Sequence, residues 1–154
     1  VMISRNLAEY HVWASQKYRE LIKSISDEDY VKEKNGRTIE GISSHIVAAL
    51  LTCFKIMEKD TADVYIWLEG ASRDELLSRW HDLDTRLLKL SLIVPKATIS
   101  VPHLGDKPFA LDAEDFVLQY ILHTIHHRGQ LGLILREFGY DVPGTDYLHF
   151  FNER

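Results

Sequence analysis

Apolar residues recur at alternating spacings of three and four in four long segments of this chain. That period places apolar side chains on one face of an α-helix. A helix with one apolar face is stable only when that face is buried against another element, so this pattern constrains the fold strongly. It predicts an all-α fold, a four-helix bundle in one domain over residues 1–154. The four stripes cover residues 3–25, 42–56, 76–94 and 116–138.

Residues that favour helix ends lie at the borders of these stripes. Thr38 and Asp112 suit the N-cap position before the second and fourth helices. Ser72 and Glu75 have the spacing of a capping box, in which each side chain accepts a hydrogen bond from the other residue's backbone N–H. Gly139 follows the fourth stripe, and glycine commonly ends a helix there. We therefore expect helices over residues 3–24, 38–59, 72–94 and 112–138.

The segments between the helices differ in composition. Ser26–Arg37 is polar and charged, contains an Asn-Gly turn signal, and is expected to be an irregular connection. Val64–Trp67 is an apolar patch that forms either a short buried loop or the mouth of a pocket. Pro95 ends the third helix, and the β-prone stretch Ala97–Val101 predicts a short hairpin or loop before the fourth. The aromatic residues of the tail, 140–154, are expected to pack on the bundle or on a second subunit.

The composition excludes several classes of protein. Lys and Arg number 18 against 23 Asp and Glu, and the net charge of −5 without a basic cluster argues against a nucleic-acid partner. No apolar run reaches the length of a membrane span, and the first residues lack the apolar region of a signal peptide. The single cysteine, Cys53, excludes an internal disulfide and is expected to be a small buried hydrophobe. We expect a cytoplasmic protein with no nucleic-acid or membrane partner.

Two histidines occupy the fourth stripe at positions where the other stripes carry apolar residues. His123 and His127 are four residues apart, so they share one helix face and can hold one metal ion. A buried imidazole must be hydrogen-bonded or metal-bound to be tolerated. Such pairs also occur as solvated or mutually hydrogen-bonded groups. Arg128 is rotated away from the face that carries the two histidines, and it is expected in a structural ion pair. Gly129 and Gly132 are expected at close contacts between helices.

A third histidine, His45, lies near the start of the second helix beside its apolar stripe. From there it can face the bundle interior and meet the pair at distances typical of zinc coordination. Gln119 and Gln130 lie near the same face of the fourth helix and are candidates to hydrogen-bond the metal ligands. His11 is expected to pack between helices. The histidines expected to be solvated surface residues are His81, His103, His126 and His149.

The sequence Ser44-His45-Ile-Val-Ala, followed by His123-x-x-x-His127-Arg-Gly-Gln130, resembles the DinB/YfiT-like superfamily. The resemblance extends over most of the chain and implies an up-down-down-up four-helix bundle, often a homodimer. It also implies a divalent metal, commonly nickel or zinc, held by His45, His123 and His127. Members with known activity include thiol S-transferases that use bacillithiol or mycothiol, and a thiol-dependent isomerase. This chain departs from the common pattern at Leu122, where asparagine is frequent, and at His126, where tyrosine is frequent.

Three protein ligands leave at least one metal position open, as in catalytic zinc sites. An open divalent metal activates a bound water or binds a thiol as its thiolate. The residue directly after His123 is Thr124 rather than glutamate, so the general base of the His-Glu-x-x-His proteases is missing. We expect an enzyme that transfers a low-molecular-weight thiol of the bacillithiol type to a small electrophile. The alternatives are a hydrolase that uses metal-bound hydroxide and a non-catalytic metal-binding stress-response bundle, which a closed site would favour.

Overall fold

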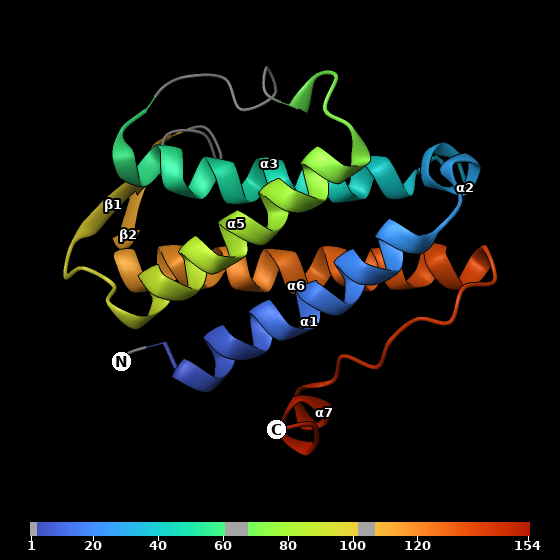
Figure 1. Ribbon diagram of the computed structural model, residues 1–154. Coiled ribbons are helices and arrows are strands. Elements are labelled where there is room, and N and C mark those ends of the chain that lie inside the picture. The colour runs from blue at the N-terminus through green and yellow to red at the C-terminus, as the bar shows by residue number, and fades with distance from the viewer. Residues whose placement is uncertain (1–2, 61–67, 102–106) are drawn as a thin grey trace.

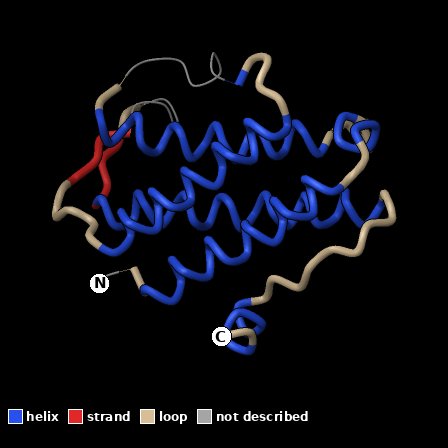
Figure 2. The backbone as a smooth tube through the Cα atoms, viewed as in Figure 1, coloured by secondary structure: helices blue, strands red, loops and turns tan. Residues whose placement is uncertain are grey.

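A computed structural model describes residues 3–60, 68–101 and 107–154. Its four long helices pack as a bundle, which confirms the predicted fold class (Figure 1). They are α1 (Arg5–Ser24), α3 (Ile39–Glu58), α5 (Arg73–Leu92) and α6 (Ala113–Glu137). Helices α1 and α6 run in one direction and α3 and α5 in the other, so the bundle is up-down-down-up (Figure 1). The smaller elements are α2 (Asp27–Val31), β1 (Thr98–Val101), β2 (Phe109–Asp112) and α7 (Tyr147–Asn152) (Figure 2).

The helix ends follow the capping residues closely. Thr38 Oγ1 accepts from the backbone N–H of Gly41 at 2.8 Å, and Ser72 and Glu75 form the predicted capping box. Gly139 has φ +90°, a conformation that favours glycine, directly after the last turn of α6. Asp112 takes the N-cap position of α6, but its side chain makes no capping hydrogen bond. The prediction for Asp112 was therefore right in position and wrong in mechanism.

One expected connection contains a helix. Within 26–37, Ser26 caps α2 by accepting from the backbone N–H of Asp29 at 3.1 Å, and Tyr30 is buried. A helix of five residues is too short to show a periodic stripe, so the sequence pattern missed it. The first helix also begins at Arg5 rather than at Ile3. The apolar patch at 64–67 lies outside the described residues.

The predicted hairpin is present before α6. Strands β1 and β2 pair antiparallel, with Thr98 opposite Asp112 and Val101 opposite Phe109. The backbone N–H of Ala113 donates to the carbonyl of Ala97 at 2.8 Å, which ties the first residue of α6 to the hairpin. The hairpin therefore fixes where α6, the helix with the histidine pair, enters the bundle.

The core lies where the four stripes meet. Helix α3 packs between α5 and α6, and by length and composition it could cross a membrane, with a mean hydropathy of 1.4. The expectation that no apolar run reaches this length was therefore wrong for α3. However, 56% of the most apolar 18-residue stretch of α3 is buried inside the bundle, as in the core helix of a globular domain. The largest side chains with no exposure are Ile22, Ile39, Ile46, Leu50, Trp80, Leu87, Ile121, Leu131 and Leu135.

The C-terminal tail returns to the bundle, as its aromatic residues predicted. Phe150 of α7 is buried against α1, with ring centroids 6.0 Å from Tyr10 and 5.6 Å from Trp13. Tyr10 Oη also donates to the backbone carbonyl of Thr145 at 2.7 Å. Leu148, on the other side of α7, is 79% exposed.

Candidate metal centre

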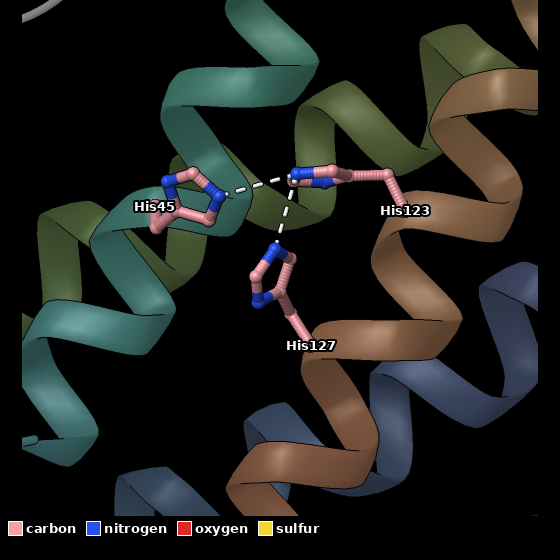
Figure 3. Close-up of side chains that lie close together, drawn as sticks. All are labelled: His45, His123 and His127. Carbon is pink, nitrogen blue, oxygen red and sulfur yellow. Dashed lines mark hydrogen bonds between the residues drawn. The ribbon is translucent and has the colours of Figure 1, made fainter.

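Three imidazoles from two helices converge between α3 and α6 (Figure 3). His45 lies in the first half of α3, and His123 and His127 lie one turn apart on α6. The Nε2 atom of His123 is 3.2 Å from Nε2 of His45 and 3.1 Å from Nε2 of His127. The ligand atoms of all three rings lie within 4.8 Å of one another. We call these three residues the histidine cluster.

The geometry of the histidine cluster fits a metal ion. Two nitrogens that bind one tetrahedral zinc ion at 2.0–2.1 Å stand about 3.3 Å apart. The observed Nε2 separations of 3.1 and 3.2 Å are close to that spacing. Nitrogen lone pairs that face each other repel, so each contact needs either a hydrogen or a cation between the atoms. A divalent ion would satisfy all three nitrogens at once.

Gln130 fixes the orientation of His127. Nδ1 of His127 donates to Oε1 of Gln130 at 2.8 Å, so the hydrogen of the neutral ring is on Nδ1 and the lone pair is on Nε2. The Gln130 amide in turn donates to Nε2 of His126 at 3.3 Å. This second contact holds the amide with its oxygen toward His127. Sequence reasoning placed Gln130 correctly and gave His126 no role.

Gln119 does not take the role predicted for it. It is exposed, and no hydrogen bond joins it to the histidine cluster within the described ranges. Nδ1 of His123, its expected partner, is buried without a hydrogen-bond partner there. The reason is the tilt of helical side chains toward the N-terminus. Gln130 leans back over His127, whereas Gln119 leans away from His123.

The histidines are less buried than their stripe positions suggested. His123 and His127 are half-buried and His45 is exposed, so the cluster lies at the rim of the core rather than inside it. Burial, followed by the neighbouring His127, His45 and His126, lowers the pKa of His123 to about 4. Burial, followed by His127, also lowers the pKa of His45. Both rings are therefore neutral at neutral pH, which is the form that binds metals.

A solvent-accessible hollow opens beside the cluster. Its volume is about 380 Å³, and His45, His127 and Gln130 are among the residues that line it. None of its lining residues is a carboxylate, and Arg37 is its formally charged member. Sequence reasoning did not single out Arg37, because only the fold brings residue 37 to this site. The full lining is Gly36, Arg37, Thr38, Gly41, Ile42, His45, His127 and Gln130.

The residues next to the cluster are structural. Arg128 is buried, and it donates to Ser15 Oγ at 3.1 Å and Tyr10 Oη at 3.4 Å. Within the described ranges it contacts no carboxylate, so the predicted ion pair is not found there. A Cβ on Gly132 would lie 2.7 Å from Tyr18 Oη, which confirms a close helix contact there. Gly129 faces open space, so the same expectation was wrong for Gly129.

Expectations for Cys53 and His81 can also be compared with the structure, whereas His103 lies outside the described residues. Cys53 is buried, and burial raises the pKa of its thiol to about 12, so it is the inert hydrophobe that was predicted. His81 is exposed, as expected, but its Nδ1 also lies 3.4 Å from Arg19.

A second polar group lies at the α1–α5 interface and was not predicted. His11 Nε2 donates to Asp84 Oδ1 at 2.8 Å, and Arg19 donates to Asp84 Oδ2. His11 is 1% exposed and Asp84 is fully buried. We call His11, Arg19 and Asp84 the α1–α5 polar network. No hollow described for this structure is lined by any of the three.

Comparison with known proteins agrees with the resemblance seen in the sequence. A model of the DinB family matches residues 102–153, which include His123, His127 and Gln130. Protein DinB of Bacillus subtilis (strain 168) is 24% identical over 153 residues, which cover 92% of this chain and 89% of that protein.

Two solved structures share the fold. One is a proposed DinB family member from Exiguobacterium sibiricum 255-15, with a TM-score of 0.66 and 19% identity over 94% of this chain and 98% of that chain. The other is a DinB-like protein from Bacillus subtilis, with a TM-score of 0.60 and 16% identity over 91% of this chain and 97% of that chain.

The fold and the site together define a class: a four-helix bundle in which three histidines from two helices form a candidate metal centre. The comparisons narrow this class: residues 102–153 are similar to the DinB family, and the chain as a whole has a DinB-like fold.

Proposed function

We propose that this protein is a metal-dependent enzyme that transfers a low-molecular-weight thiol to a small electrophile. The observation that carries the proposal is the convergence of the Nε2 atoms of His45, His123 and His127 beside an open hollow that His45 and His127 line. An open approach favours an enzyme over a closed metal-binding bundle, because a substrate can reach the cluster. A structural zinc site would have four protein ligands, and the cluster found among the described residues has three.

The protein's own residues would prepare the site. His45, His123 and His127 would hold a divalent ion, with zinc and nickel the expected identities. Such an ion lowers the pKa of a coordinated thiol and so supplies a nucleophilic sulfur at neutral pH. Gln130 keeps the lone pair of His127 directed at the cluster. Cys53 is buried, so the reacting thiol would come from a cosubstrate.

The lining of the hollow favours a thiol over water as the nucleophile. A hydrolase commonly uses a carboxylate near the metal as a general base. No carboxylate lines the hollow described beside the cluster. A thiol does not need a general base, because it is far more acidic than water and would be deprotonated on binding to a metal. The absence of a base in this part of the site therefore supports thiol transfer over hydrolysis.

A panel of thiols tests the proposal. Purified protein is loaded with Zn²⁺ or Ni²⁺, and the consumption of each thiol with a generic electrophile is measured with and without a chelator. We expect metal-dependent consumption of at least one thiol, and its loss in His45→Ala. The matched control is His149→Ala, which removes an exposed histidine of α7. If no thiol is consumed in a metal-dependent way, the proposal is wrong.

Three expectations from the sequence stay predictions. We expect a homodimer, which light scattering after size-exclusion chromatography would test. We also expect the protein to work in the cytoplasm on a small-molecule substrate, and fractionation of the source cells would test the location.

A further inference from the structure

The hollow beside the histidine cluster carries one unpaired cation. Arg37 lines it, and its guanidinium has no hydrogen-bond or ion-pair partner among residues 3–60, 68–101 and 107–154. The protein as a whole has a net charge of −5, so a positive site stands out against its surroundings. A second hollow of about 170 Å³ adjoins the first, and Arg37, Ile42 and Gln130 line both.

The backbone of Arg37 is fixed by a tight turn. The backbone N–H of Lys34 donates to the carbonyl of Arg37 at 2.8 Å, and the reverse hydrogen bond measures 3.1 Å. Asn35 and Gly36 between them have φ +53° and +76°, the positive values that a type I′ turn requires. The Asn-Gly pair that predicted a turn thus fixes the backbone position of Arg37.

The same turn is anchored to the end of α6. Lys34 Nζ donates to the backbone carbonyl of Glu137 at 2.6 Å and lies 4.8 Å from the ring centroid of Phe138. Asn35 Nδ2 donates to the Glu137 carboxylate at 3.4 Å. Lys34 and Asn35 are therefore engaged with α6, and Arg37 is the group of the turn that remains available to a ligand.

The start of α3 beside Arg37 favours an anion over a cation. Arg37 directly precedes Thr38, the N-cap of α3, where the helix dipole repels a cation. A divalent ion in the neighbouring cluster would add to that repulsion. Burial raises the pKa of Tyr30 of α2, and Glu40, the acidic residue of this first turn of α3, raises it further. A negatively charged ligand in the hollow would be attracted by Arg37, the helix terminus and the metal together.

We infer that the substrate or cosubstrate carries a carboxylate near its reactive group, and that Arg37 binds this carboxylate. The inference rests on the proposed function, because the reactive group must reach the histidine cluster. Arginine is suited to the role, since its planar fork makes two parallel hydrogen bonds to a carboxylate. Arg37 would act as a specificity-determining residue, while His45, His123 and His127 hold the metal.

Binding of two matched thiols to Co²⁺-loaded protein tests the inference. Mercaptoacetate carries a carboxylate and 2-mercaptoethanol does not, and the visible spectrum of Co²⁺ reports thiolate binding to each. We expect wild-type protein to prefer mercaptoacetate, and Arg37→Gln to weaken mercaptoacetate binding about tenfold or more. Binding of 2-mercaptoethanol and of Co²⁺ itself should change little. Arg37→Lys should retain part of the preference, and added salt should reduce it.

A charge-matched control separates a local contact from the change in net charge. Lys32→Gln removes the same charge from an exposed side chain that pairs with Glu28 and lines neither hollow. We expect Lys32→Gln to keep the wild-type preference. An equal preference in wild type and Arg37→Gln, or none in wild type, overturns the inference and leaves the metal centre standing. Failure of Co²⁺ to bind overturns the metal centre and the inference with it.

Discussion

The histidine cluster and the α1–α5 polar network both place histidine between helices, yet their surroundings differ. In the network, His11 meets the carboxylate of Asp84, and Arg19 binds the second oxygen of that group. In the cluster, the Nε2 atom of His123 faces the Nε2 atoms of His45 and His127 at 3.2 and 3.1 Å. The network is closed to solvent, whereas the cluster borders a hollow. A buried histidine paired with a carboxylate serves the fold, whereas converging imidazoles without a carboxylate are suited to bind an external cation.

The largest effect on stability is expected in the α1–α5 polar network. Asp84→Ala leaves the buried Arg19 without its carboxylate, which should lower the free energy of unfolding by about 3–5 kcal/mol. Denaturant unfolding of metal-free protein measures this loss. Asp82→Ala removes an exposed carboxylate two residues away and should change stability by less than about 0.5 kcal/mol. Equal stabilities for the two variants would contradict a structural role for Asp84.

Metal affinity should depend next on Gln130. Gln130→Ala frees the ring of His127, and loss of such a hydrogen bond typically weakens metal binding about 10–100-fold. Competition with a chelator measures the affinity. Gln119→Ala is the matched control, since Gln119 is exposed on the same helix and should not alter binding. If both variants bind metal as wild type does, Gln130 has no part in the site.

His126 should have a smaller effect on metal affinity than Gln130, because it acts only through the Gln130 amide. His126→Ala should weaken binding by a few-fold. A loss as large as that of Gln130→Ala would show that His126 does more than orient the amide.

A separate prediction concerns the pH dependence of the metal-free cluster. The folded pKa of His123 is about 4, below the ordinary value of 6.5. Between these values the unfolded chain binds a proton that the folded protein does not, so stability falls as pH drops from 6.5 toward 4. The midpoint of denaturant unfolding at pH 7 and pH 5, measured with a chelator, tests this. His123→Ala should show a shallower decline, and an unchanged decline would contradict the lowered pKa.

Much of the fold was readable from local patterns. The stripes gave the four long helices, and Thr38, Ser72 and Gly139 marked helix ends that the structure confirms. The pattern could not reveal α2, which has too few residues for a period. Nor could it reveal the α1–α5 polar network, because Arg19 and Asp84 resemble surface residues until the register of two helices brings them together.

The candidate site was only partly readable. His123 and His127 share a helix face by spacing alone, and His45 could be added because it lies beside the stripe of its own helix. The burial of His123 and His127 was overestimated, since a stripe position near the rim of a bundle is only half-buried. Arg37 depends on a turn anchored to residues a hundred positions later, which no local pattern contains.

The central claim is that His45, His123 and His127 bind one metal ion together. Elemental analysis of purified protein, after incubation with Zn²⁺ and removal of unbound ion, tests it directly. We predict one metal ion per chain in wild type and in His149→Ala, and almost none in His123→Ala and His127→Ala. Wild-type amounts of metal in the His123→Ala and His127→Ala proteins would contradict the claim.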